Sequence, residues 1–374
     1  MEQISNQLNE NFNSKDKIIL FPSPSCPWGY LFQRPQQLAR AFAKKGFKVI
    51  YMVDTSFTYA PDWYVRGLNR IEESIFLYND GLGGKVLTEN LRNIYTIIWQ
   101  YWPHQNSVIE QFQKHHNTSL VYDCIDHLTT FDEYPEIMSH HSKALENADV
   151  VIATANSIKK EVSKWRDDCL LIQNGVNVED FKTVLHKASD SDSITLGYYG
   201  AIAEWFDYEL IKQVAILRPN WNFIIVGEVY PACIIQVREL SKISNIQFLP
   251  RVTYSEIPEL LGQFDIALLP FKINEITRNT SPVKIFEYMA GGKITISSSL
   301  PEVIGLHGVL TYDTQEEMLK QIHNAITLKN DEKYVNSLKL EAINHSWISK
   351  VDLILKHMTD GGMVNGSAPK NTDF

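Results

Sequence analysis

The sequence is built from short apolar runs, rich in valine and isoleucine, that alternate with segments of helical periodicity. Most runs are continuously apolar, which is typical of strands buried on both faces of a parallel sheet. Alternation of strand and helix predicts right-handed βαβ units, and therefore an α/β fold with doubly wound parallel sheets. The expected strands are 18–22, 49–53, 94–99, 120–124, 150–153, 170–173, 195–199, 223–226, 246–249, 266–270, 294–298 and 309–312, and expected helices include 36–45, 137–148, 208–218 and 257–263.

The strand and helix pattern restarts after the polar stretch 187–193, KASDSDS, which we expect to be a linker. A chain of 374 residues is long enough for two domains of ordinary size. We therefore predict two Rossmann-like domains, 17–186 and 187–345, that face a central cleft. Ligands of such sheets bind beyond the carboxyl ends of the strands, so the loops there are where functional residues are expected.

The two ends of the chain are predicted to lie outside these domains. Residues 346–360 are expected to form a final helix that returns to the first domain, with Trp347 as a structural anchor. Polar composition predicts flexible tails at 1–16 and 361–374. The start lacks an apolar signal region, and no segment approaches the roughly 18 apolar residues of a membrane span. We expect a cytoplasmic protein, and peripheral contact with the inner face of the plasma membrane stays open.

The formal net charge of −9 argues against a nucleic-acid partner, because affinity for nucleic acid comes from neutralising phosphates with Lys and Arg. Neither a disulfide nor a zinc site is expected, because the four cysteines lie far apart without a CxxC pair. The DSD motif at 190–192 falls in the expected linker, and the pairs His115–His116 and His140–His141 lack metal-ligand spacing. We expect no metal and no other cofactor.

The most informative segment is 280–292, TSPVKIFEYMAGG. Ser281 is predicted to be the N-cap of a helix and Pro282 its first residue, and a glycine pair ends the helix. The helix N-terminus would attract an anion, which would also explain Lys284 in the first turn, where a cation opposes the helix dipole. Glu287 lies on the same face, where it could accept hydrogen bonds from a ribose diol. An exposed Lys284–Glu287 ion pair on an ordinary helix is an equally supported alternative.

Two further groups of residues are candidates in the first half of the chain. Asp123 and Asp126 follow a predicted strand, where a carboxylate could act as general base or simply cap a turn. We favour Asp126 as the base, because it lies farther into the loop. An aromatic loop carries Trp28, Tyr30 and Arg34, a set that suits a sugar or lipid-phosphate acceptor, although packing beneath the loop is equally supported.

The run SPVKIFEYMAGGKITIS, followed by LPEV, resembles the nucleotide-sugar-binding helix of bacterial GT-B glycosyltransferases. The resemblance covers roughly residues 17–350, and it includes enzymes of the teichuronic-acid-biosynthesis type, which are family 4-like and make surface polysaccharides. Other stretches that follow the order of this family are FPSPSCPWGYLFQRPQQLARAFAKKGFKVIYM, VYDCIDHLTTF, ADVVIATANS, LIQNGVNVEDF, LGYYGAIAEWFDYELI and IPELLGQFDIALLPF.

The resemblance implies a GT-B fold and transfer of a sugar from a nucleotide-diphosphate sugar, UDP-linked in our expectation, to a hydroxyl of a polysaccharide or lipid-linked acceptor. Asp126 and Lys284 would be catalytic, and Trp28, Tyr30 and Arg34 would bind the acceptor. The residues expected at the donor are Gly197, Gly200, Arg251, Val252, Ser281, Pro282, Val283, Lys284 and Glu287. A strand-to-loop turn is the alternative role for the two glycines, and a surface cation is the alternative for Arg251.

The sequence departs from the family pattern at two places. Retaining members usually carry two glutamates separated by seven residues, and Asn279 stands where the first would be. The loop 201–207, AIAEWFD, lacks the Arg/Lys pair that often neutralises the diphosphate. Lys284, the helix N-terminus and Arg278 would then carry more of this neutralisation. A nucleotide-sugar-binding protein without transferase activity and a nucleotide-sugar epimerase are the alternative functions.

Overall fold

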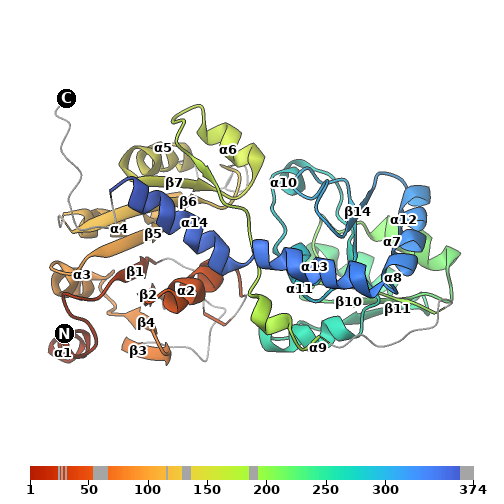
Figure 1. The fold of residues 1–374 in the computed structure, drawn as a ribbon, viewed down its shortest axis with the longest axis horizontal. Helices are drawn as coiled ribbons and strands as arrows, with labels where there is room; N and C mark the ends of the chain where they lie inside the picture. The colour runs from red at the N-terminus through yellow and green to blue at the C-terminus, as the bar shows by residue number, and fades with distance from the viewer. Residues whose placement is uncertain are drawn as a thin grey trace. The chain divides into compact units, whose positions relative to one another are not determined.

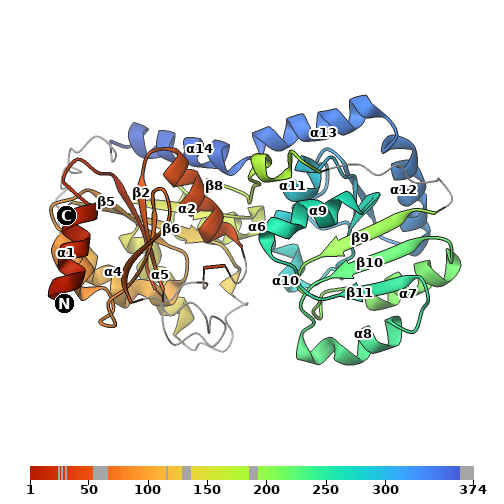
Figure 2. The same ribbon diagram turned by 90° about the horizontal axis from the view of Figure 1, so that it is seen from below.

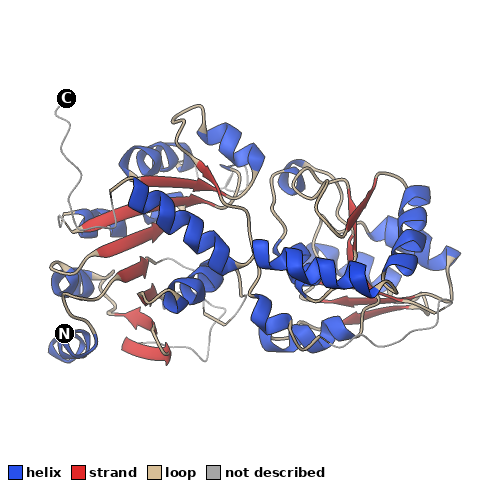
Figure 3. Ribbon diagram, viewed as in Figure 1, coloured by secondary structure: helices blue, strands red, loops and turns tan. Residues whose placement is uncertain are grey.

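The structure is a computed structural model that describes residues 1–23, 26, 28–29, 32–53, 66–114, 117–128, 136–184 and 193–362. The chain divides into two compact units (Figure 1). The first consists of Met1–Gln173 and Trp347–Phe374, and the second of Asn174–Ser346. Both alternate strands with helices, as Figure 3 shows by colour. The expected α/β fold is confirmed, and the expected cleft between the domains stays a prediction.

The first unit contains an eight-stranded sheet in the order β3-β4-β2-β1-β5-β6-β7-β8. Its strands are β1 (Ile18–Phe21), β2 (Lys48–Met52), β3 (Gly67–Glu72), β4 (Ile75–Asn79), β5 (Thr96–Gln100), β6 (Thr118–Cys124), β7 (Val150–Ala153) and β8 (Leu170–Leu171). All pairs are parallel except β3 with β4, an antiparallel hairpin at the sheet edge that the sequence analysis missed. The helices are α1 (Glu2–Asn11), α2 (Arg34–Lys44), α3 (Lys85–Leu91), η1 (Pro103–Gln105), α4 (Asn106–Gln113), α5 (Ile137–Asn147), α6 (Asn156–Val162) and α14 (Trp347–Asp360).

Residues 1–16 are not the flexible tail that we expected. They form α1, in which Ile4 and Leu8 lie one turn apart, and Phe12 directly follows the helix on the same side. Leu8 and Phe12 are buried, and the Phe12 ring lies 5.1 Å from that of Phe76 on β4. The polar composition hid this apolar face, because only three side chains carry it. Residues 363–374, most of the other predicted tail, lie outside the described residues.

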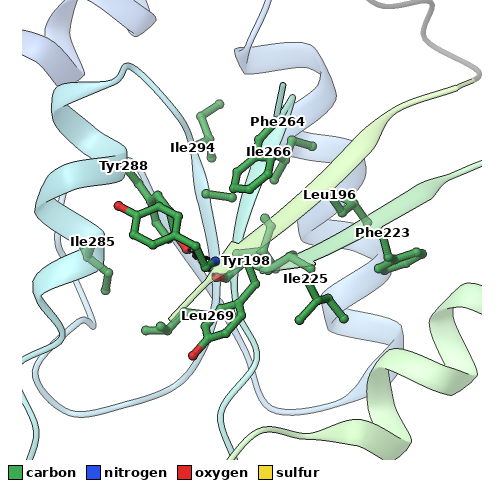
Figure 4. Packing of buried hydrophobic residues seen from close by; sticks show 14 of the residues in the cluster. Leu196, Tyr198, Phe223, Ile225, Phe264, Ile266, Leu269, Ile285, Tyr288 and Ile294 are labelled. Atoms are coloured by element: carbon green, nitrogen blue, oxygen red, sulfur yellow. Dashed lines mark hydrogen bonds between the residues drawn. The ribbon is translucent and has the colours of Figure 1, made fainter. Parts of the chain in front are cut away.

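The second unit contains a six-stranded parallel sheet in the order β11-β10-β9-β12-β13-β14; β9, β10 and β11 lie side by side in Figure 2. Its strands are β9 (Thr195–Tyr199), β10 (Asn222–Val226), β11 (Ile246–Leu249), β12 (Ile266–Leu269), β13 (Thr295–Ser298) and β14 (Val309–Tyr312). The helices are η3 (Val178–Phe181), α7 (Tyr208–Leu217), η4 (Pro231–Cys233), α8 (Ile234–Leu240), η5 (Tyr254–Glu256), α9 (Ile257–Gly262), α10 (Glu275–Arg278), α11 (Val283–Ala290), α12 (Gln315–Leu328) and α13 (Glu332–Asn344). Apolar side chains of β9, β10, β12 and α11 meet in one core (Figure 4).

The boundary between the units falls at Asn174 rather than at residue 187. Val176 and Phe181 are fully buried in the core of the second unit, so residues 174–184 belong there. The predicted linker lies almost entirely outside the described residues. At the second crossing, α14 begins with the buried Trp347 and packs against α2 of the first unit (Figure 1).

Candidate functional site

The carboxyl ends of β9 and β10 bring two glycines against each other at one edge of the second sheet. Gly200 has a φ of 137°, and its N–H donates to the carbonyl of Val226 over 2.9 Å. A Cβ on Gly227 would lie 1.8 Å from the Gly200 carbonyl oxygen, and one on Gly200 would lie 2.1 Å from Lys284 Cε. Only glycine therefore lets the backbone and the Lys284 side chain approach so closely.

Lys284 is the second residue of α11, and its ammonium lies against the end of β9. The side chain is half-buried, and Nζ lies 5.8 Å from the centre of the Tyr198 ring. Burial lowers the pKa of Lys284, and the nearby charge of Glu287 opposes this effect in part. Within the described part of the chain, Lys284 makes no ion pair. A cation with reduced hydration and no paired carboxylate is suited to receive an anion.

Glu287 is buried rather than part of an exposed ion pair. It is 4% exposed, and its Oε2 accepts a hydrogen bond of 2.6 Å from the Tyr199 hydroxyl. Burial raises the pKa of Glu287, while the Tyr199 hydrogen bond and the Lys284 charge lower it. The exposed-pair interpretation of Lys284 and Glu287 is therefore wrong. Both side chains belong to a partly desolvated polar cluster at the strand ends.

The predicted cap of α11 is wrong. The helix begins at Val283, and Pro282, with extended backbone, occupies the N-cap without a side-chain capping bond. Ser281 binds Asn174 instead: its Oγ accepts from the Asn174 N–H over 3.3 Å, and its carbonyl accepts from Asn174 Nδ2 over 2.7 Å. A residue before proline is biased away from helical backbone, which places Ser281 outside the helix. The glycine pair ends α11 as predicted, with Gly291 at the C-cap.

Asn279, which stands where the family has its first glutamate, is held by a local bond. Its Nδ2 donates to the carbonyl of Glu275 over 2.7 Å, at the end of α10. Arg278 beside it is exposed. The amide is thus bound to the backbone of α10, which Asn279 follows, and the position supplies no negative charge.

The other donor candidates differ in how they are placed. Gly197 lies inside β9, where a Cβ would come within 2.1 Å of the Phe264 ring. Packing alone therefore accounts for a glycine at this position, and the contact of Gly197 with a ligand stays a prediction. Arg251 is exposed in the loop after β11, at the same sheet edge as Gly200, and Val252 packs partly against the core of this unit.

In the first unit, Asp123 and Arg34 form a buried ion pair. Arg34 Nε and Nη2 donate to the two carboxylate oxygens over 2.7 and 3.0 Å, and Trp99 Nε1 donates to Oδ2 over 3.0 Å. Their side chains are 4% and 1% exposed. The guanidinium of Arg34 is enclosed and already paired, which favours a structural role for Arg34 and Asp123. The acceptor contact expected of Arg34 and the division of the two aspartates into one structural and one functional residue stay predictions.

The aromatic loop also packs inward where it is described. Trp28 is 7% exposed, and its ring lies 5.3 Å from that of Tyr51 and 5.7 Å from that of Phe32. This burial favours the packing alternative for Trp28, and the acceptor contact expected of Trp28 stays a prediction. Tyr30 lies outside the described residues.

Asp126 is the candidate of the first unit that remains open to solvent. Protein atoms around the carboxylate limit its hydration, which raises the pKa of Asp126 to about 6. The group would therefore be ionised at neutral pH and still basic enough to accept a proton. Whether it faces a substrate stays a prediction.

Comparison with known proteins relates part of the second unit to glycosyltransferases. Residues 193–327 match the family Glycosyl transferases group 1. This part of the chain is a glycosyltransferase group 1 domain. The chain is also 23% identical over 262 residues to TuaH of Bacillus subtilis (strain 168), named as a teichuronic acid biosynthesis glycosyltransferase. That match spans 64% of this chain and 66% of TuaH.

Solved GT-B structures share the fold of nearly the whole chain. HepE of Anabaena, solved with UDP and glucose, has a TM-score of 0.65 at 15% identity and covers 92% of this chain and 100% of its own. Sucrose-phosphate synthase of Thermosynechococcus elongatus has a TM-score of 0.66 at 15% identity, with the same coverage. The predicted GT-B fold is confirmed.

The described residues contain neither a cluster that could hold a metal ion nor a helix long and apolar enough to cross a membrane. All four cysteines are free thiols. Of the histidine pairs, His141 is buried against the Tyr122 hydroxyl over 2.8 Å, and burial lowers its pKa to about 4. His115–His116 and the DSD motif at 190–192 lie outside the described residues.

Sequence reasoning did not single out Asn174, whose bonds to Ser281 join residues 107 positions apart. The small amide side chain of Asn174, at the start of the second unit, was the signal that the sequence offered. Tyr199 was missed as well, because it lies within an apolar strand and shows no separate pattern.

Proposed function

We propose that the chain transfers a sugar from a nucleotide-diphosphate sugar, UDP-linked, to a hydroxyl of a cell-surface polysaccharide or lipid-linked acceptor. The observation that carries the proposal is Lys284: a half-buried ammonium without an ion pair in the described chain, beside Gly200 and in the first turn of α11. The group 1 family match and the name of TuaH support transferase activity. The UDP bound to HepE supports the choice of nucleotide.

The proposed reaction breaks the bond between the sugar C1 and the diphosphate oxygen, and forms a bond from C1 to the acceptor oxygen. The acceptor proton passes to a base, for which we propose Asp126. Negative charge then grows on the leaving diphosphate. Lys284 and the N–H groups of the first turn of α11 would stabilise this charge. Such electrostatic stabilisation is strongest where water is excluded.

Glu287 would hold the ribose of the donor. Its carboxylate is oriented by the Tyr199 hydroxyl over 2.6 Å, so it can accept hydrogen bonds from a diol at low entropic cost. We propose that the cationic side chain and the helix terminus neutralise the diphosphate without a resident metal ion. The acceptor would be bound by the first unit, at the cytoplasmic face of the plasma membrane.

Lys284→Ala and Glu287→Ala test the donor site. We expect each variant to lose transfer by about 10²–10³-fold, the usual effect of removing a group that stabilises transition-state charge. Release of UDP from a panel of UDP-sugars is measured with a lipid-linked acceptor extract, and UDP binding by calorimetry. Lys320→Ala, at an exposed position of α12, is the matched control and should keep full activity. Near-normal turnover in both site variants would contradict the assignment.

One observation favours a second candidate, a nucleotide-sugar-binding protein without transferase activity. Asn279 supplies no carboxylate where retaining members of the family have one, and its amide is bound to the Glu275 carbonyl. This function predicts that UDP-sugars bind to the unmodified protein but release no UDP with any acceptor. Measured turnover would exclude it.

A further inference from the structure

The N-terminus of α11 is held in place by a residue far away in the sequence. Pro282 provides no side-chain cap for this helix, so the chain just before it needs another support. Asn174 supplies it through two hydrogen bonds to Ser281, from Nδ2 to the carbonyl over 2.7 Å and from N–H to Oγ over 3.3 Å. Ser281 is only 5% exposed, so water is a poor substitute for these bonds.

Asn174 lies in a segment that is packed into the second unit. Val176, two residues later, is fully buried, and its N–H donates to the His345 carbonyl over 3.1 Å. The His345 ring stacks on Phe286 of α11, with the ring centres 4.8 Å apart. The segment that carries Asn174 is thus connected to α11 both through Ser281 and through Phe286.

We propose that Asn174 is a positioning residue for donor binding. This inference rests on the proposed function. By fixing the carbonyl of Ser281 it sets the direction in which the chain leads into α11. That direction determines where the first-turn N–H groups and Lys284 point. A binding site for a diphosphate depends on such directions, because small displacements of oriented donors weaken their hydrogen bonds.

The test compares three variants that leave the Lys284 and Glu287 side chains in place. Asn174→Ala removes the amide, and Asn174→Leu removes it while retaining most of the side-chain volume. Lys320→Ala, at an exposed position of α12, is the matched control and leaves both bonds between Asn174 and Ser281 in place. UDP is the probe, and isothermal calorimetry reports both its Kd and its stoichiometry.

We expect both Asn174 variants to raise the Kd for UDP by about tenfold, the effect of one lost hydrogen bond at a buried site. The Kd of Lys320→Ala should stay within about twofold of that of the unmodified protein, because this variant loses no bond near α11. A merely structural role would lower the stoichiometry by unfolding part of the sample, and would leave the Kd of the folded fraction unchanged.

Three results would overturn the inference. One is an unchanged Kd in both Asn174 variants while Lys284→Ala weakens UDP binding, which would leave the proposed function standing. Another is a Kd in the control Lys320→Ala raised as much as in Asn174→Ala. Absence of UDP binding by the unmodified protein would overturn the proposed function, and this inference with it.

Discussion

Replacing Arg34 by methionine should destabilise the first unit strongly, because it leaves the carboxylate of Asp123 buried without its cation. The two side chains are 4% and 1% exposed and are joined by bonds of 2.7 and 3.0 Å. Trp99 Nε1, at 3.0 Å, would still donate to the carboxylate. Removing one partner of such a buried pair costs about 3–5 kcal/mol. Methionine keeps the aliphatic length of the side chain, so the loss reports the charge and its hydrogen bonds.

Hydrogen exchange measured over a urea series, with peptides resolved by mass spectrometry, assigns the loss to one unit. Peptides of β1, β5 and β6 should lose about 3–5 kcal/mol of protection, while peptides of the second unit serve as an internal reference. Arg40→Met is the matched control on the same helix. Its pair with Glu72 has exposed fractions of 29% and 35%, so we expect a cost of about 1 kcal/mol or less.

The double variant Arg34→Met, Asp123→Leu removes the unpaired charge as well. It should recover much of the lost stability, because a buried ion pair can often be replaced by apolar side chains. A loss below about 1 kcal/mol in Arg34→Met, or a loss equal to that of Arg40→Met, would refute the reasoning. A stable Arg34→Met protein that fails only with the acceptor would instead restore the acceptor role predicted from the sequence.

Two further predictions concern the strand ends and the proposed base. Gly197→Ala should lower the stability of the second unit by about 1–3 kcal/mol through overpacking, and should leave the Kd for UDP unchanged. Gly200→Ala should instead displace Lys284 and weaken UDP binding. Thermal unfolding measures the stability, and calorimetry measures the Kd. Equal effects of the two variants on UDP binding would contradict the separate roles. Because the pKa of Asp126 is raised to about 6 and a base must be ionised, kcat/KM should fall as the pH decreases through about 6. Asp126→Asn should lose this dependence together with most of the activity, and a decline that begins only near pH 4, the ordinary carboxylate range, would refute the assignment.

The parallel sheets could be predicted because their signal is local in the chain. Each buried strand is a short continuous apolar run, and the predicted bounds differ from those observed by a few residues at most, as for β9 at Thr195–Tyr199 and β6 at Thr118–Cys124. The hairpin of β3 and β4 escaped because β3, GLNRIE, is half polar at an exposed sheet edge. Helix α1 escaped because its apolar face is only three side chains wide.

The residues proposed for the donor site could be selected from the sequence for the same reason, while their role stays a prediction. The spacing of Lys284 and Glu287 and the helix that carries them are visible in the segment 280–292. Gly200, which follows β9, is visible in a separate short segment. The surroundings of these side chains in the folded protein are not visible in either segment. Tyr199 donates to Glu287 from 88 residues away, and this contact, with burial, turns an ordinary helical pair into a desolvated cluster.

The sequence by itself determined the α/β class, the two units and the helix that carries the proposed donor residues, because these depend on hydrophobic periodicity along the chain. Only the tertiary structure decided that Arg34 is paired inside the first unit, that Asn174 holds the start of α11, and that the second unit begins at residue 174. The physical reason is separation: Arg34 meets Asp123 across 89 residues, and Asn174 meets Ser281 across 107. Contacts of that range depend on how the strands are ordered in the sheet, and they leave no period in the sequence.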